Sequence, residues 1–223
     1  MQKNLSGFHF GLVIALGAVW GFSEAALGLG LQKCATLMSG SIMTGVALFF
    51  IASGWVLSGR VLGVAVLIIT ASLIKLFDAL LLSLPLRHGA VANPIFAFFM
   101  EGLAFLAVVS LIRKSQKKKM SGQAFLGVAA ALGAVCAFPL VKFATGVPAC
   151  VFPGTRIPLS LYYGPLAVAV SALTVPLGFW AGNRLREPVN RWETAGQHKA
   201  LKYIVSPLTI ILCLVLITLI RRG

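Results

Sequence analysis

Five ionisable side chains interrupt the apolar stretches of this 223-residue sequence. Three of its five acidic residues, Glu24, Asp78 and Glu101, fall inside such stretches, together with Lys75 and Lys142. A charge near the centre of a bilayer costs a few kcal/mol, so such side chains normally face the interior of a helix bundle or a cavity. There they can bind a cationic or hydrogen-bonding ligand, balance an anionic one, or hold helices together as ion pairs.

Three further residues near these charges have side chains that suit a ligand. Trp20 lies one helical turn before Glu24 and can stack on a planar group. His88 and Asn93 lie in a polar connector that leads into the next apolar stretch. Helix capping by Asn93, with Pro94 in the first turn, is the simpler role for that pair. The candidate ligand-binding residues are Trp20, Glu24, Lys75, Asp78, His88, Asn93, Glu101 and Lys142.

The same charges also allow a purely structural interpretation. Lys75 and Asp78 are three residues apart, so they share a helix face and can neutralise each other. Glu24 and Lys142 can form a second pair. Glu101 then lacks an obvious partner, and a carboxyl group in that position is either protonated or available to a cation or ligand.

The apolar stretches that carry these residues dominate the composition. Hydrophobic residues make up 59% of the chain and charged residues 11%, against roughly 25% charged residues in a soluble domain. Stretches of about 20 residues are long enough to cross the hydrocarbon of a bilayer as helices. Because they are continuous rather than alternating in polarity, they exclude a β-barrel. We predict an all-α transmembrane bundle of six or seven spans, forming one domain over residues 1–223.

The spans and one long connector can be placed along the chain. The predicted spans cover residues 8–31, 37–57, 61–84, 94–112, 122–144, 165–182 and 203–220. The connector over residues 145–164 has three prolines and two tyrosines. It predicts either a lid or re-entrant loop over an outer cavity, or a plain loop with an aromatic belt.

Lysine and arginine set the predicted orientation. With the N-terminus inside, twelve of the 19 basic residues lie on the cytoplasmic side, five lie outside and two lie within spans. The terminal pair Arg221–Arg222 is the outer exception. We therefore predict a multi-pass protein of the inner (cytoplasmic) membrane with a cytoplasmic N-terminus. Its net charge of +14 would serve orientation and contact with anionic lipid headgroups rather than nucleic acid.

This topology brings the five ionisable groups to the outer half of the membrane. We expect the three carboxyl groups to point inward and lie near one another, with Lys142 close enough to neutralise one of them. A cavity beside Glu101, roofed by part of residues 145–164, would then support ligand binding.

An internal repeat is a further hypothesis. A shift of 116 residues superposes residues 11–34 on 127–150 with nine identities. Parallel three-helix halves joined by the fourth span would explain the match, as in some transporters, and so would chance similarity between spans rich in glycine and alanine. Cys34 and Cys150 fall at equivalent outer positions, where they could form a disulfide if that side is oxidising.

Four short motifs in the first half of the chain carry a resemblance. They are WGFSE (20–24), IKLFD (74–78), NP (93–94) and EGL (101–103). This combination resembles a family of small bacterial membrane proteins without an assigned function. In size, number of spans and small-residue first helix, the chain is also similar to the S-components of energy-coupling-factor (ECF) transporters, which capture vitamins or metal ions. That resemblance implies an energising membrane and ATPase partner, although a seventh span departs from the usual six.

These observations favour a small-solute transporter or a substrate-binding transporter subunit. A lipid-modifying enzyme that uses the same carboxyl groups and a structural or assembly subunit are the alternatives. The sequence has no G-x-S-x-G, H-E-x-x-H or P-loop motif, so we predict no catalytic residue and no cofactor. No second histidine accompanies His88, so no metal site is predicted either.

Overall fold

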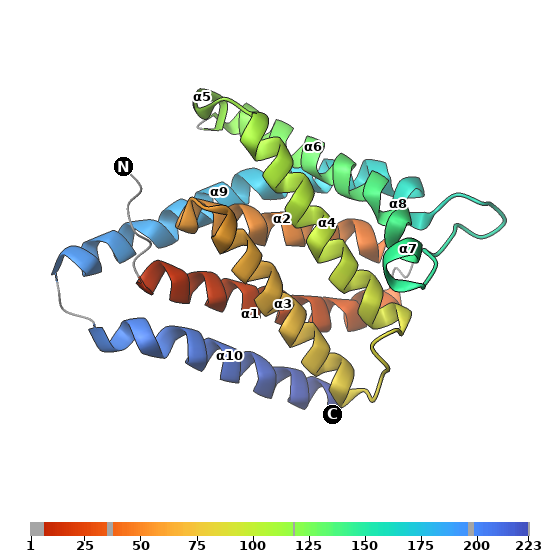
Figure 1. The fold of residues 1–223 in the computed structure, drawn as a ribbon, viewed down its shortest axis with the longest axis horizontal. Helices are drawn as coiled ribbons and strands as arrows, with labels where there is room; N and C mark the ends of the chain where they lie inside the picture. Colours follow the sequence, from red (N-terminus) through yellow and green to blue (C-terminus); the bar gives the residue numbers. More distant parts are fainter. Residues whose placement is uncertain (1–6, 35–37, 118, 196–198, 223) are drawn as a thin grey trace.

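The computed structural model describes residues 7–34, 38–117, 119–195 and 199–222. Apart from one isolated β-bridge between Val151 and Pro158, the described residues form helices and their connections (Figure 1). The helices are α1 (Gly7–Cys34), α2 (Ser39–Ser58), α3 (Val61–Leu81), α4 (Gly89–Leu111), α5 (Lys114–Lys117), α6 (Met120–Ala137), the 3-10 helix η1 (Phe138–Leu140), α7 (Val141–Thr145), α8 (Leu159–Tyr162), α9 (Gly164–Ala195) and α10 (Lys199–Arg222).

Within the described part of the chain, seven helical segments are long and apolar enough to cross a membrane. They are His9–Leu27, Ser39–Ser58, Val61–Leu81, Gly89–Leu111, Met120–Thr145, Gly164–Glu187 and Ile204–Arg222. The predicted all-α polytopic bundle is therefore confirmed. The fourth and sixth spans differ most from their predictions: α4 begins at Gly89 and not at Pro94, and the sixth span continues to Glu187 and not only to Gly182.

Close helix contacts depend on small residues. In α1, a Cβ added at Gly21 would lie 2.8 Å from the Ala71 carbonyl oxygen and 2.6 Å from the Ile74 Cβ of α3. Glycine at this position lets α1 and α3 approach closely, and these two helices carry Glu24, Lys75 and Asp78. The small-residue stripe thus sets the spacing of the charged side chains.

An aromatic cluster fills the core beside this contact. The Trp20 ring is fully buried and lies 4.6 Å from the Phe98 ring and 6.5 Å from the Phe50 ring, centroid to centroid. These side chains join α1, α2 and α4. Aromatic rings at such separations add a favourable geometry to the burial of their large apolar surfaces.

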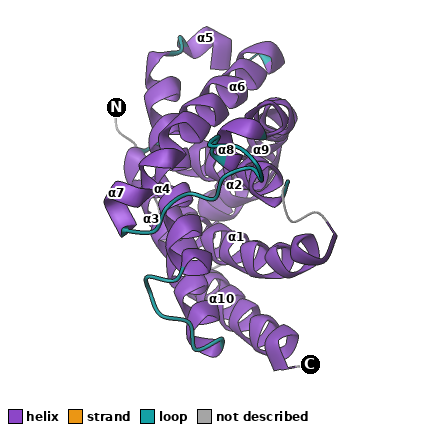
Figure 2. Ribbon diagram, turned by 90° about the vertical axis from the view of Figure 1, so that its right-hand side faces the viewer, coloured by secondary structure: helices purple, strands orange, loops and turns teal. Residues whose placement is uncertain are grey.

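The packing does not follow the hypothesised repeat. Helix α1 packs against α3, whereas their counterparts α6 and α10 lie on opposite sides of the bundle (Figures 1 and 2). Helix α10 instead packs against α1 and α3. The two three-helix halves are thus not arranged alike, and the packing does not support the repeat.

The two ends of the bundle differ in their connections. One end, which we call the loop end, carries the connector 82–88, the segment 146–163 and the C-terminus of α10. Figure 2 looks onto this end and shows the segment between α7 and α8 crossing the bundle. The opposite end, which we call the basic end, carries Arg60 and the Arg113–Lys119 region. Which end faces the outside stays a prediction.

Two spans are irregular near the loop end. The long helix that starts at Met120 changes to a 3-10 turn at Phe138–Leu140 before α7, where Pro139 cannot donate a backbone hydrogen bond. Pro94 lies within α4 and deprives the Ala90 carbonyl oxygen of its usual helical donor. Phe138, Ala90 and Pro94 all line the cavity described next.

Candidate functional site

A cavity of about 750 Å³ lies among α1, α2, α3, α4, α6 and α9 at the loop end. Its wall includes Glu24, Asp78 and Glu101, which are 7%, 1% and 3% exposed. The segment 146–163 contributes Val147, Pro148, Cys150, Leu159, Ser160 and Tyr163 to the same wall. The volume falls in the range of about 300–1,000 Å³ that is typical of small-molecule sites.

Asp78 is the best-compensated acidic group of the cavity. Its Oδ1 accepts a hydrogen bond from Arg221 Nε at 2.6 Å, and its Oδ2 accepts one from Arg221 Nη2 at 2.8 Å. Lys75 Nζ, one helical turn earlier on α3, lies 3.4 Å from Oδ2. A bidentate arginine and a lysine fully offset one buried carboxylate, and the Arg221 pair fastens the end of α10 to α3.

Glu24 occupies a different electrostatic position. It lies on α1 in the cavity wall, and Lys75 is close enough to interact with its charge. Among the described residues, however, the salt bridges of Lys75 and Arg221 are both made to Asp78 and not to Glu24. The Glu24 carboxyl group is therefore buried without a cation of its own.

Glu101 on α4 also lacks a close cation in the described structure. Thr44 of α2 and Glu24 lie in the same cavity wall, and the Glu24 carboxyl group is near enough to repel its charge. A buried carboxyl group without a counter-ion is costly to keep ionised. The cost falls if a ligand brings a positive charge or hydrogen-bond donors.

Two further polar atoms in the wall have no hydrogen-bond partner. They are Asn93 Oδ1 on α4 and the Ser160 hydroxyl on α8, and each atom is buried. Buried polar atoms in proteins are nearly always satisfied, so such exceptions require an explanation. Both atoms belong to residues that line the cavity.

The depth of the lining indicates an entrance at the loop end. The exposed lining residues Leu82, Pro148 and Cys150 come from the connectors at that end. The three acidic side chains lie on the long helices and are buried. A solute entering from the loop end would thus meet the connectors first and the carboxyl groups deeper in the bundle.

Of the eight candidate residues from the sequence, five line the cavity and three do not. The five are Glu24, Lys75, Asp78, Asn93 and Glu101. Trp20 is fully buried in the aromatic core, so a role in stacking on a ligand is not supported. His88 is exposed and caps α4, where its Nδ1 accepts a hydrogen bond from the Ala90 N–H at 3.2 Å. The expected cap at Asn93 was therefore wrong, because the helix starts one turn earlier.

The expected neutralising role of Lys142 is also wrong. Lys142 lies on α7, its side chain is exposed, and it is absent from the cavity wall. The break at Phe138–Leu140 turns α7 away from the direction of α6, so a straight span was the wrong basis for its position. Cys150 has a free thiol. The side chain of Cys34, its expected disulfide partner, is not among those that the structure describes. The structure therefore gives no support for this disulfide.

Sequence reasoning missed Arg221, Thr44 and Ser160. Arg221 was counted as a surface charge at the end of the last span, yet it is the main partner of Asp78. Its signal in the sequence was a terminal arginine pair on the side disfavoured by the other basic residues. Thr44 and Ser160 gave no comparable signal, because hydroxyl side chains occur widely in membrane helices and loops.

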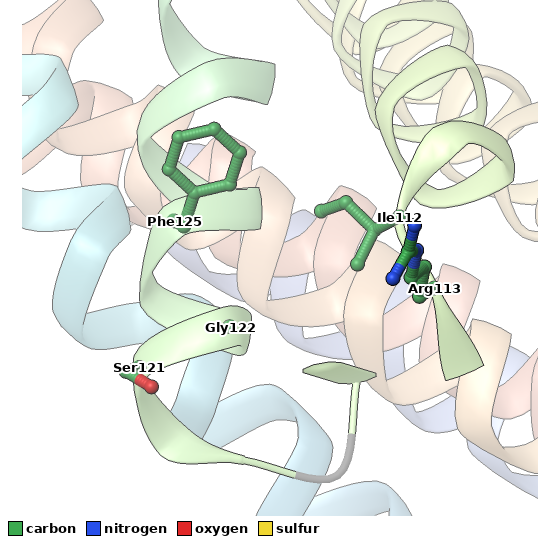
Figure 3. A pocket seen from close by; sticks show the side chains of 5 residues that line it. All are labelled: Ile112, Arg113, Ser121, Gly122 and Phe125. Atoms are coloured by element: carbon green, nitrogen blue, oxygen red, sulfur yellow. The ribbon is translucent and has the colours of Figure 1, made fainter. Parts of the chain in front are cut away.

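The basic end holds a smaller pocket of about 350 Å³. It is lined by Ile112, Arg113, Ser121, Gly122 and Phe125. Figure 3 shows Phe125 of α6 and Ile112 at the end of α4 on either side of it, with Arg113 next to Ile112. Arg113 is exposed and no acidic residue lines this pocket, so it lacks the convergence of buried charges seen at the loop end.

Comparison with protein-family models, with curated proteins and with solved structures finds no match. The function must therefore be argued from the site itself. What the fold establishes is a multi-pass membrane protein whose environment is the lipid bilayer.

Proposed function

We propose that this chain is a small-solute transporter, or the substrate-binding subunit of one, and that it binds its solute in the loop-end cavity. The observation that carries the proposal is the meeting of Glu24, Asp78 and Glu101 in one cavity of about 750 Å³ within the membrane-spanning bundle. Ionisable groups at such depth in membrane proteins mark solute and ion pathways.

The irregular spans beside the cavity support this proposal. Transporters commonly build their sites from interrupted helices, whose freed backbone groups contact the solute. Here α6 is interrupted at Phe138–Leu140 and α4 contains Pro94, and both interruptions lie in the cavity wall. A bundle held together only by ion pairs would not need a cavity at the point where its spans are irregular.

The salt bridges in the described structure account for only one of the three buried carboxyl groups in the cavity wall. Arg221 and Lys75 account for Asp78, as a structural or assembly subunit would require. Glu24 and Glu101 have no comparable partners in the described structure, although burying unpaired carboxyl groups is costly. This asymmetry favours solute binding over a purely structural role.

Energy for transport would come from elsewhere in a complex. The chain has no P-loop, and its size, number of spans and small-residue first helix resemble those of ECF S-components, which rely on a membrane partner and ATPases. We propose that this chain likewise binds the solute while a membrane partner and ATPases supply the energy. Its seventh span differs from the usual six of that group.

Mass spectrometry of small molecules that co-purify with the protein tests the proposal. The expected result is a reproducible soluble metabolite that is present with the wild type and reduced in Glu101→Gln. Recovery of a chemically altered lipid would instead favour an enzyme. Finding neither, with a normally folded wild type, would contradict solute binding and favour a structural subunit.

A further inference from the structure

We infer that the loop-end cavity selects an organic cation, a small amine or guanidine, which binds between Glu24 and Glu101. This inference rests on the proposed function and adds the charge class of the solute. It follows from which of the described charged side chains form salt bridges with one another.

The cavity wall carries more acidic than basic side chains. Three carboxyl groups, those of Glu24, Asp78 and Glu101, face two cationic side chains, Lys75 and Arg221. Both cations make their salt bridges to Asp78, at 3.4 Å and 2.6 Å. Among the described lining residues, two carboxyl groups have no salt bridge, while both cations are engaged by Asp78. This arrangement disfavours an anionic solute.

Glu24 and Glu101, the two acids of the wall without a salt bridge to a described residue, share one buried region. Glu24 on α1 and Glu101 on α4 are 93% and 97% buried, line the same cavity and lie close enough for their charges to repel. A positive group between them removes that repulsion and restores a counter-charge to both. Glu24 forms no short salt bridge with a described residue, so its position is open to such a ligand.

The cavity wall also contains hydrogen-bond acceptors. Asn93 Oδ1 is a buried acceptor without a partner, and the Ser160 hydroxyl can accept as well as donate. An ammonium carries three donors and a guanidinium five. The same wall contains Met43, Phe98 and Met100, so an amine with an apolar body matches both parts of the lining.

A metal ion fits the site less well. Within the described residues, no group of three or more His, Cys, Asp and Glu side chains is placed to hold one. Divalent cations take several oxygen ligands at once, and Ca²⁺ takes six to eight. Two carboxyl groups on separate helices, in a wall that also has apolar side chains, suit an organic cation better.

The test measures charge selectivity on the purified full-length protein. Butylamine, phenethylamine and butylguanidine are compared with butanol, phenethyl alcohol, butyrate and phenylacetate, with binding followed by thermal stabilisation and calorimetry. We expect at least one cation to bind about 10-fold or more tightly than its neutral and anionic counterparts. Glu24→Gln and Glu101→Gln should each weaken that binding by about 10-fold or more, and Glu187→Gln, an exposed acid on α9, should leave it unchanged.

The outcomes separate this inference from the proposed function. Preferred binding of an alcohol or carboxylate that is lost in Glu101→Gln would overturn the cation and leave the solute site in place. Cation binding that survives both glutamine variants would overturn the position between Glu24 and Glu101. Binding by no compound of any charge class would contradict the cavity as a solute site, and with it both proposals. The wild-type series decides the charge class even if a variant fails to fold.

Discussion

The loop end and the basic end of this bundle hold charge in opposite ways. At the loop end, three acidic side chains are buried on long helices around a cavity of about 750 Å³. At the basic end, Arg113 and Lys119 are exposed, and the described residues that line the pocket of about 350 Å³ include Arg113 and no acidic residue. Exposed charges near a membrane surface are solvated and interact with lipid headgroups, whereas buried ones need specific partners.

This contrast shows that the position of a charge matters more than its number. The chain has 19 basic and five acidic residues, yet the few buried acids define the candidate site. We therefore expect substitutions at the loop end to change stability and binding, and matched substitutions at the basic end to change neither. The following experiments sharpen or break that expectation, beginning with the largest effect.

The largest loss of stability is expected for Asp78→Asn. The change leaves the positive charges of Arg221 and Lys75 without their common counter-ion. Removing one partner of a buried ion pair costs about 3–5 kcal/mol. Thermal unfolding in detergent should show this loss, and the double variant Asp78→Asn with Arg221→Met should recover part of it, because the uncompensated arginine is removed. A double variant no more stable than Asp78→Asn would show that Arg221 is not the relevant partner.

An intermediate loss is expected for Gly21→Ala, which tests the helix contact beneath the charges. The added Cβ would lie 2.8 Å from a backbone oxygen of α3, so the helices must separate, at about 1–3 kcal/mol. The matched control is Gly133→Ala, whose Cβ would meet only the Ala104 Cβ at 3.3 Å. Since both changes gain the same helix propensity, the control should be neutral or slightly stabilising. Equal effects of the two changes on the unfolding temperature would contradict the close α1–α3 packing.

A small change of stability but a large change of binding is expected for Glu101→Gln. Glutamine preserves the shape of the side chain and leaves no cavity, so the free energy of unfolding should change by less than about 1 kcal/mol. Arg113→Gln at the basic end should also lie within about 0.5 kcal/mol of the wild type. Loss of solute from Glu101→Gln, with retention by Arg113→Gln, would separate the two ends. Equal retention by both variants would mean that Glu101 does not bind the solute.

No change of stability is expected in the labelling experiment that assigns the sides of the membrane. In two single-cysteine proteins, Ser115→Cys and the native Cys150 provide exposed thiols at the basic and loop ends. With a cytoplasmic basic end, an impermeant maleimide should label Cys150 in intact cells and label Ser115→Cys only after lysis. Ready labelling of Ser115→Cys in intact cells would reverse the predicted orientation.

The sequence alone predicted the spans well because apolar length is a local property. Each of the seven spans needed only about 20 consecutive apolar residues to be recognised, and the described part of the chain has seven such segments. The start of α4 was placed too late because Asn93–Pro94 is typical of a helix start, while the actual cap is His88. The helix thus includes Pro94, because tertiary packing overrides the local preference for a helix start at Asn93–Pro94.

The candidate site was only partly predictable from the sequence. The cost of burying Glu24, Asp78 and Glu101 was enough to expect them to face inward, and the structure lines one cavity with all three. Arg221, counted as an outer surface charge, pairs with Asp78, whereas Lys142, expected to neutralise a carboxyl group, is exposed on α7. Pro139 and the terminal arginine pair are visible in the sequence, but neither tells which carboxyl group a cation reaches, because that depends on tertiary packing.

The most direct measurement of the central claim is water access to the cavity in the membrane. In a cysteine-free background, Ala97→Cys places a thiol in the cavity wall one helical turn from Glu101, and Leu103→Cys places one on the outward face of the same helix, where Leu103 is 58% exposed. The permanently cationic reagent trimethylammonioethyl methanethiosulfonate is applied to both variants in a bilayer. A cavity that admits cations from the loop end predicts rapid modification of Ala97→Cys and none of Leu103→Cys, which faces lipid. An unreactive Ala97→Cys, or equal reactivity of the two thiols, would contradict the account.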